Sequence, residues 1–254
     1  MNEQQRIFIR MAYNGNGFNG WQIQPNGVTV QEELQKALAI ILRFEVVVIG
    51  CGRTDTGVHA SEFFAHFDFE GEIPLSLDQM KYKLNNILPR GIAIYALFLV
   101  DPEMHARFSA LSRTYRYQIC REKNPFLLNT AYYYYLPLDI AAMNAAAAIL
   151  FEYIDFTCFS KSNTQVKTNN CIITQAEWAI EGPLLVFTIT ADRFLRNMVR
   201  AIVGTLLDVG LGKLTLDGFR AVIENKNRSK AGFSVPAQGL FLCNVVYPDN
   251  LKTQ

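Results

Sequence analysis

The sequence lacks the features of several protein classes at once. Its longest apolar stretches, such as Ile92–Val100, fall well short of the roughly 20 residues that a membrane-spanning helix needs. The N-terminal segment Met1–Arg6 has no apolar core of the kind that a secretory signal carries. We therefore expect a cytoplasmic protein with no membrane partner.

Cysteine and histidine are also scarce. The five cysteines are odd in number, widely spaced and contain no C-x-x-C pair, which is typical of reduced and mostly buried thiols. The three histidines, His59, His66 and His105, show no metal-like spacing with cysteines or carboxylates. We expect neither a disulfide framework nor a metal site, and we interpret the histidines as loop or core residues.

The net charge of the whole chain is close to zero, but one segment is clearly basic. The formal net charge is +1, so the whole chain is not strongly basic in the way of many nucleic-acid-binding proteins. Residues 106–123 nevertheless hold five Lys or Arg against one Glu. With 50% apolar and 19% charged residues in 254, the chain can bury a core of one large or two modest domains.

Hydrophobic periodicity predicts six elements in the first half. Apolar residues at helical spacing, preceded by the capping-box pattern Thr29–Glu32, predict a helix over residues 30–42, and a second helix covers residues 77–88 up to Pro89. Alternating or β-branched runs predict strands over residues 6–13, 44–49, 63–69 and 91–100. The resulting order, β-α-β-β-α-β, is that of the split βαβ unit.

The second half is interpreted in the same way. Strands are predicted over residues 113–120, 171–180, 184–190 and 240–247, and helices over residues 139–151, 193–209 and 216–223. We expect an α+β fold in which two ferredoxin-like halves, residues 1–104 and 105–254, join into one mostly antiparallel sheet with helices on one face and a central cleft.

The loop over residues 50–60 is the strongest candidate for chemistry. It lies between two apolar strands and holds three glycines within eight residues, which allow sharp turns or close approach of a ligand. It does not match a phosphate-binding P-loop or G-x-G-x-x-G, so no nucleotide cofactor is indicated. From composition alone, a tight connector in which Asp55 caps local N–H groups is the more common structure.

The residues of this loop carry a specific resemblance. Gly50-Cys51-Gly52-Arg53-Thr54-Asp55-Thr56-Gly57-Val58-His59-Ala60 resembles the G-x-G-R-T-D-x-G-V-H-A signature of the tRNA pseudouridine synthase A family. The likeness extends along nearly the whole chain. It includes residues 20–22, 30–31, 34, 105–108, 113–117, 194–195, 198–200, 203–204, 236–237, 239–240 and 246–247. An ordered set of this kind does not arise by chance.

The resemblance implies both an activity and partners. It implies isomerisation of uridine to pseudouridine at positions 38, 39 and 40 of the tRNA anticodon stem-loop, by a homodimer that uses no cofactor. Asp55 corresponds to the family's catalytic aspartate. The chain departs from the family at Asn14 and Asn16, where the family usually has Asp and Thr, and we expect this to alter a surface turn and not the chemistry.

The chemistry requires an ionised carboxylate beside the ribose. Asp55 could attack C1′, attack the base at C6 or remove a ribose proton, and the sequence does not choose among these routes. Burial in a cleft disfavours a lone anion, so a permanently charged arginine is needed nearby. Arg200 is the family's counterpart for that role.

Arg200 belongs to a predicted basic stripe. On a helix over residues 193–209, Arg193, Arg196 and Arg200 fall within about 60° of one another. An ordinary solvated face is the usual explanation of such a stripe, and the motif match favours a surface that binds RNA.

Three further residues are candidates for binding substrate. A paired uridine must leave the stack before it can rotate, and Arg53 matches the family's arginine that enters the stack, although a phosphate contact or loop ion pair is the alternative. Tyr115 could lie against the flipped base, unless it is a core aromatic of its strand. Leu240 is a weaker candidate for the apolar pocket wall. For the run Tyr132–Tyr135, core packing is favoured over contact with RNA.

Two other classes remain as alternatives. The protein could be a catalytically silent RNA-binding protein, which the presence of Asp55, Arg53, Tyr115 and Arg200 speaks against. It could also be an aspartate-dependent hydrolase that acts on a small molecule, which would need a second acid or base near Asp55. No such group is evident in the sequence.

Overall fold

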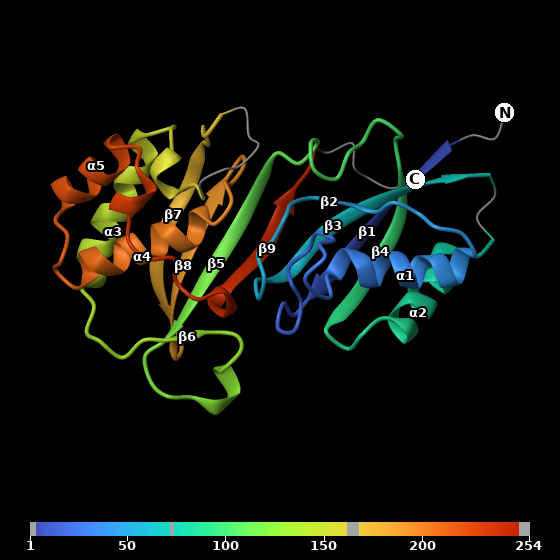
Figure 1. Ribbon diagram of the computed structural model, residues 1–254, viewed down its shortest axis with the longest axis horizontal. Helices are drawn as coiled ribbons and strands as arrows, with labels where there is room; N and C mark the ends of the chain where they lie inside the picture. Colours follow the sequence, from blue (N-terminus) through green and yellow to red (C-terminus); the bar gives the residue numbers. More distant parts are fainter. Residues whose placement is uncertain (1–3, 72–73, 162–167, 249–254) are drawn as a thin grey trace. The chain divides into compact units, whose positions relative to one another are not determined.

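The computed structural model describes residues 4–71, 74–161 and 168–248, so the first three residues of the segment Met1–Arg6 lie outside it. The chain divides into two compact units, one formed by Met1–Leu111 with Leu242–Gln254 and the other by Ser112–Phe241 (Figure 1). From the sequence we expect the boundary after residue 104 and the whole C-terminal segment in the second half. In the structure the chain returns to the first unit at Leu242.

The first unit contains the predicted β-α-β-β-α-β order. Its elements are β1 (Gln4–Tyr13), α1 (Val30–Leu42), β2 (Ile49–Gly50), β3 (His59–Glu70), α2 (Leu77–Ile87) and β4 (Ile92–Val100). Strand β1 pairs antiparallel with both β3 and β4, and β2 pairs with β3. Thr29 caps α1 by accepting a hydrogen bond from the Glu32 N–H at 3.3 Å, and Ser76 and Gln79 form a reciprocal capping box at α2.

Both faces of the β1–β3 pair are packed. On one face, Ile7, Ile9 and Met11 lie opposite Phe67, Ala65 and Phe63, and all six side chains are buried. On the other face, Phe8 stacks on His66, whose Nδ1 accepts a hydrogen bond from the Ala106 N–H at 3.1 Å. The prediction that His66 is a core residue is therefore confirmed.

The strand predicted over residues 44–49 is wrong apart from its end. Only Ile49 and Gly50 form β2, because side-chain amides of α1 take the place of a strand partner. Gln35 Oε1 accepts from the Val48 N–H at 3.0 Å, and Gln31 Nε2 donates to the Val48 carbonyl at 2.7 Å. Val46 and Val48 are buried while Val47 is exposed, so the side chains of this segment alternate as in a strand although it lacks a strand partner.

The second unit repeats the mixture of sheet and helices. It contains β5 (Ser112–Cys120), β6 (Tyr132–Tyr133), α3 (Ile140–Ile149), β7 (Ile173–Glu181), β8 (Leu184–Ala191), α4 (Met198–Gly210) and α5 (Leu216–Glu224), and β9 (Leu240–Val246) begins in it. Strand β8 pairs antiparallel with β5 and β7. Helix α3 lies against β7, where the Asn144 amide bonds the backbone N–H and carbonyl of Trp178 at 2.7 and 3.1 Å.

The long helix predicted over residues 193–209 begins later than expected. Helix α4 starts at Met198, because Asn197 has a left-handed backbone (φ 67°) that interrupts a helix. The preceding residues are held elsewhere: the Asp192 carboxylate accepts from the N–H groups of Ile172 and Arg193, both at 2.7 Å. The single helical stripe of Arg193, Arg196 and Arg200 is therefore wrong, because the first two residues precede the helix.

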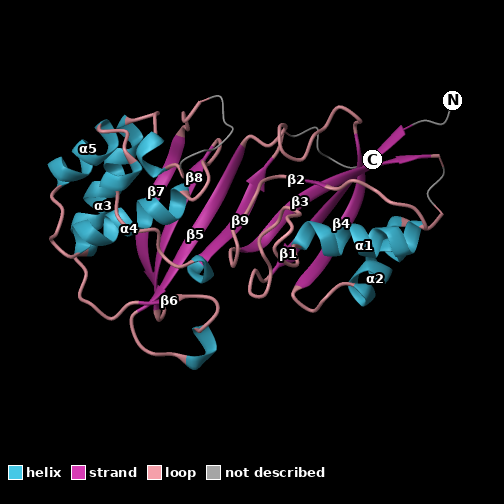
Figure 2. Cartoon of the chain, viewed as in Figure 1, coloured by secondary structure: helices cyan, strands magenta, loops and turns pink. Residues whose placement is uncertain are grey.

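The strands follow the hydrogen-bonded order β4-β1-β3-β9-β5-β8-β7, with β2 on β3 and β6 on β5. Apart from the parallel pair β5–β6, the pairings described above are antiparallel, so the predicted α+β class with a mainly antiparallel sheet is confirmed (Figure 2). Within the described residues, no helix is long and apolar enough to cross a membrane. All five cysteines lie in the described part; four are buried, and none forms a disulfide.

Candidate active site

The loop over residues 50–60 is fixed at both ends to the sheet of the first unit. It leaves β2 at Gly50 and enters β3 at His59. The Cys51 N–H donates to the Phe64 carbonyl at 2.7 Å, and the Val58 N–H donates to the Asp55 carbonyl at 3.1 Å. Asp55 thus lies in a turn between two anchored ends.

A second segment, residues 13–21, holds the loop from the side. The Tyr13 hydroxyl lies 2.9 Å from Thr54 Oγ1 in a buried contact, and the Trp21 N–H donates to the Thr54 carbonyl at 3.3 Å. The Gly15 N–H donates to His59 Nδ1 at 2.9 Å, which confirms His59 as a structural residue. The residue before Asp55 is therefore held by both its side chain and its backbone.

Two glycines make this close contact possible. A Cβ atom at Gly20 would lie 2.4 Å from the Thr54 carbonyl oxygen, and one at Gly15 would lie 2.2 Å from the Val58 carbonyl oxygen. Asn14 and Asn16, on either side of Gly15, are exposed, and Asn14 Oδ1 accepts from the Asn16 N–H at 2.9 Å. The two residues that depart from the family pattern therefore lie in a surface turn.

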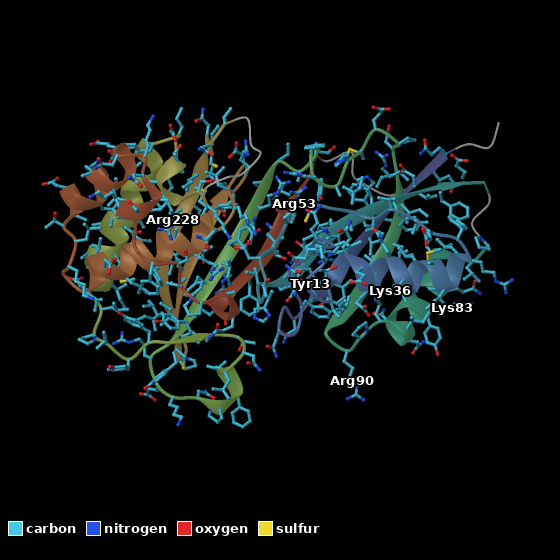
Figure 3. The ribbon with its side chains drawn as sticks, viewed as in Figure 1. Tyr13, Lys36, Arg53, Lys83, Arg90 and Arg228 are labelled. Carbon is cyan, nitrogen blue, oxygen red and sulfur yellow. The ribbon has the colours of Figure 1, made fainter. Side chains whose placement is uncertain are left out.

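Asp55 and Arg53 remain accessible on this hydrogen-bonded loop. Asp55 is half-buried, whereas Thr54 and Val58 on either side of it are buried. Arg53 is exposed, and its side chain makes no hydrogen bond or ion pair with the described residues (Figure 3). The loop therefore offers a positioned carboxylate and an arginine that protein contacts leave available for a ligand.

The other predicted site residues belong to the second unit. Tyr115 lies on β5 and is half-buried, and its ring meets that of Phe194 edge to face with centroids 5.0 Å apart. Leu240 is buried at the start of β9. Arg196 is exposed and Arg193 half-buried in the segment before α4. Tyr115 is thus not a fully buried core aromatic.

Arg200 lies in the first turn of α4. Its Nε donates to the Val235 carbonyl at 2.7 Å, and the Val235 N–H donates to the Arg200 carbonyl at 3.2 Å. The first turn contains no acidic residue, and the side chain of the N-cap Asn197 makes no capping bond. A cation at the positive end of a helix is electrostatically unfavourable, so this position favours the approach of an anionic group.

The run Tyr132–Tyr135 is divided between two environments. Tyr132 and Tyr134 are half-buried with ring centroids 5.4 Å apart, whereas Tyr133 and Tyr135 are exposed. The prediction of core packing therefore describes one alternate pair and not the other.

The contacts that support these residues join segments that lie far apart in the sequence. Tyr13 and Thr54 are 41 positions apart, and Arg200 and Val235 are 35 apart, so no local pattern links them. The close spacing of Gly15, Gly17 and Gly20 was the available signal, because glycines allow two backbones to approach closely.

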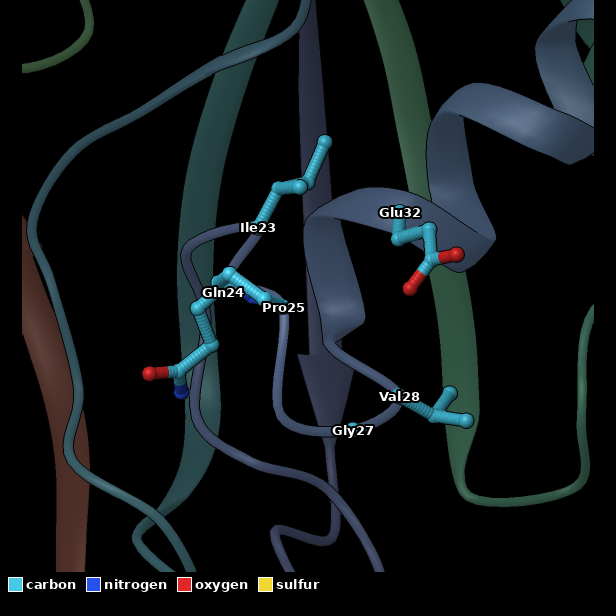
Figure 4. Close-up of a pocket in the computed structure, with 6 residues that line it drawn as sticks. All are labelled: Ile23, Gln24, Pro25, Gly27, Val28 and Glu32. Atoms are coloured by element: carbon cyan, nitrogen blue, oxygen red, sulfur yellow. The ribbon is translucent and has the colours of Figure 1, made fainter.

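The structure also contains an open pocket of about 560 Å³ in the first unit (Figure 4). It is lined by Ile23, Gln24, Pro25, Gly27, Val28 and Glu32, and none of the predicted site residues is among them. In the described ranges, no group of three or more His, Cys, Asp or Glu side chains could hold a metal ion.

Comparison with known proteins identifies the class to which this fold and loop belong. A sequence model of the family described as tRNA pseudouridine synthase matches residues 149–248. Full-length relatives are more informative. The chain is 58% identical over 249 residues to the tRNA pseudouridine synthase A of Parabacteroides distasonis, which covers 97% of this chain and 98% of that protein.

Similar matches come from other bacteria. The tRNA pseudouridine synthase A of Bacteroides fragilis is 57% identical over 248 residues (97% of this chain, 98% of that protein), and that of Bacillus subtilis is 40% identical over 246 residues (95% and 99%). The chain belongs to the tRNA pseudouridine synthase A family, and it is an isomerase.

Proposed function

We propose that this enzyme converts uridine to pseudouridine at positions 38, 39 and 40 of the tRNA anticodon stem-loop, with Asp55 as its catalytic carboxylate. The observation that carries the proposal is the placement of Asp55: a half-buried carboxylate directly after Thr54, which is held by Tyr13 and Trp21. A carboxylate on so constrained a backbone is oriented before substrate arrives, which is what catalysis by a single positioned group needs.

The reaction breaks the bond between C1′ and N1, turns the uracil in place and rejoins it to C1′ through C5. The proton on C5 is lost and N1 gains one, so atoms balance and no cofactor is needed. Asp55 acts as a nucleophile at C1′ or C6, or as a base toward the ribose, and each route needs its ionised form. The half-buried position keeps the carboxylate accessible to a nucleotide.

The remaining predicted residues take supporting roles in this proposal. Arg200 is the counterion of Asp55, and its unfavourable place at the positive end of α4 supports an anionic neighbour. Arg53 enters the RNA stack, and Tyr115 and Leu240 bind the flipped uracil. The part-exposed ring of Tyr115 supports a stacking role. Arg193 and Arg196 contact phosphates, which supply affinity more than specificity.

The proposal also includes the assembly and its location. The enzyme works as a homodimer in the cytoplasm, where a tRNA contacts both subunits. A net charge of only +1 supports this assembly, because two copies bring together basic surface that one copy has in small amount.

Replacement of Asp55 by asparagine tests the catalytic assignment. Asp55→Asn keeps the shape of the side chain but removes the anion, so pseudouridine formation in unmodified tRNA should be abolished while tRNA still binds. Asp217→Asn, an exposed substitution in the first turn of α5, is the matched control and should retain full turnover.

The readouts are pseudouridine mapping at the three positions, tRNA affinity and circular dichroism for folding. Wild-type turnover in folded Asp55→Asn would contradict the proposal. Binding of tRNA by the wild-type protein with no pseudouridine formed would favour the silent RNA-binding alternative, and the absence of both tRNA binding and pseudouridine would favour the hydrolase that acts on a small molecule.

A further inference from the structure

One segment of the second unit lies tightly along the N-terminal half of α4. It comprises residues 228–236, which we call the strap. The Gly232 N–H donates to Thr205 Oγ1 at 2.9 Å, and that hydroxyl donates to the Ala201 carbonyl at 2.8 Å. A Cβ atom at Gly204 would lie 1.8 Å from the Phe233 carbonyl oxygen, so the two backbones are in direct contact.

Ser234 links the strap to the start of the helix. Its Oγ accepts one hydrogen bond from Arg228 Nη2 at 2.7 Å and another from Asn197 Nδ2 at 2.6 Å. Asn197 is the N-cap residue of α4, and its side chain is thereby used for the strap and not for the helix N–H groups. The hydroxyl of Ser234 therefore joins three points of the chain.

The Arg228 side chain forms hydrogen bonds within the strap. Its Nη1 donates to the Gly232 carbonyl at 3.0 Å and lies 3.5 Å from the Ala231 carbonyl, while its Nη2 reaches Ser234. Arg228, labelled in Figure 3, is half-buried, whereas Lys230 two residues later is exposed. A planar fork that bonds backbone and hydroxyl at once cannot be replaced by a lysine.

The strap ends at the residue that holds Arg200. Val235 follows Ser234 directly, is completely buried, and exchanges two hydrogen bonds with Arg200, one of them from the guanidinium Nε. Because Nε is bonded, the guanidinium is fixed by its inner edge and its terminal amino groups are oriented. These groups form the edge that pairs with carboxylates and phosphates.

We propose that Ser234 and Arg228 are positioning residues that act on the reaction through Arg200. The inference rests on the proposed role of Arg200 as counterion. The path runs from Arg228 through the Ser234 hydroxyl to the Val235 carbonyl and the Arg200 guanidinium. A shift of the Val235 carbonyl moves the charge relative to the reacting ribose, and such displacement lowers the rate of chemistry more than it weakens binding of a large RNA.

Substitution of the hydroxyl tests the first step. Ser234→Ala should lower kcat about tenfold, with KM for tRNA within about twofold of wild type, because small misplacements of a catalytic group are costly while phosphate contacts persist. Ser234→Thr keeps the hydroxyl and should restore most of kcat. Lys230→Ala, which removes a charge from the same segment without touching Ser234, is the control and should leave kcat unchanged.

A double-mutant cycle tests whether the effect passes through Arg200. Arg200→Lys removes the Nε bond to Val235, so Ser234→Ala in that background should cause no further loss of kcat. Multiplicative losses would overturn the proposal, and so would an unchanged kcat in folded Ser234→Ala or in Arg200→Lys. If Ser234→Ala does not fold, Arg228→Lys, which keeps the charge and loses the fork, replaces it in the same cycle. Failure of the proposed function is detected separately, by full turnover in Asp55→Asn.

Discussion

The Tyr13 hydroxyl and Thr54 Oγ1 lie 2.9 Å apart in a buried contact that joins the end of β1 to the loop carrying Asp55. Strand β1 is among the best-buried elements of the first unit, with Ile7, Phe8 and Ile9 completely inaccessible. The hydrogen bond therefore joins the candidate catalytic loop to a buried strand that lies between β3 and β4.

Tyr13→Phe tests the value of this contact. Removal of the hydroxyl leaves buried Thr54 without this partner, so the free energy of unfolding should fall by about 1–2 kcal/mol. Turnover should fall as well, because Asp55 is less firmly placed. Denaturant unfolding and pseudouridine assays measure both effects. Tyr82→Phe, at an exposed tyrosine of α2, is the control and should change neither; equal stability of Tyr13→Phe and wild type would contradict the prediction.

The glycines at residues 17 and 20 offer a matched pair for the second prediction. Both have a positive φ, 87° and 81° respectively, so alanine is strained at either position. Only at Gly20 would the new Cβ meet the loop, 2.4 Å from the Thr54 carbonyl oxygen; at Gly17 nothing lies within 4 Å.

Gly17→Ala should therefore destabilise by about 1 kcal/mol with near-normal turnover, and Gly20→Ala by more than about 2 kcal/mol with severe loss of turnover. Thermal unfolding of the two variants measures the loss of stability, and pseudouridine assays measure their turnover. Equal turnover in the two variants would show that contact between the segments does not matter for the chemistry.

The sequence predicted elements whose signals are local. The bounds of α1 agree with the prediction at both ends, because the Thr29 cap and the apolar periodicity lie within the helix itself. The predicted strand at residues 44–49 is wrong because the side-chain amides of Gln31 and Gln35 bind that segment. The predicted start of α4 is wrong because Asn197, whose side chain bonds Ser234, has a left-handed backbone.

The candidate site likewise has one part that local sequence signals predict and another that depends on contacts between distant residues. The motif at residues 50–60 indicates Asp55 and Arg53 as site residues from the sequence alone. Their support by Tyr13, and the link from Ser234 to Arg200, depend on contacts between residues far apart in the chain. Such contacts leave no periodic pattern in one sequence, so they could not be predicted.

Acid should destabilise the first unit through His66. Burial lowers the pKa of this side chain to about 4, and its Nε2 has no hydrogen-bond partner in the described structure. The unfolded chain binds the proton near pH 6.5 and the folded chain only near pH 4, so stability is lost as pH falls through this window, by about 3 kcal/mol in total.

Urea unfolding at pH 7 and pH 4.5 measures this loss. His66→Gln, whose amide oxygen can still accept from the Ala106 N–H, should show a flatter dependence on pH. His105 also has a lowered pKa, chiefly through burial, but it is only half-buried, so His105→Gln should flatten the dependence less. A wild-type slope in His66→Gln would contradict the assignment.

The proposed homodimer is tested by light scattering at micromolar concentration. A dimer of the 28.8 kDa chain should scatter at twice that mass, and its activity per subunit should fall on dilution below the dissociation constant. A species of monomer mass with full activity at every dilution would remove the dimer from the proposal.

Arg53 is exposed and has no protein partner among the described residues. If it replaces the extruded base in the RNA stack, its loss should matter most where extrusion is costly. Positions 39 and 40 are paired in the anticodon stem, whereas position 38 lies in the loop, and unstacking and unpairing a base requires a few kcal/mol. Arg53→Ala should therefore lower single-turnover rates at least about tenfold more at position 40 than at position 38.

Arg90→Ala, at another exposed arginine of the same unit (Figure 3), removes the same charge and should affect both positions equally and slightly. An equal loss at the two positions in Arg53→Ala, accompanied by a smaller salt dependence of tRNA binding, would assign Arg53 to a phosphate contact instead.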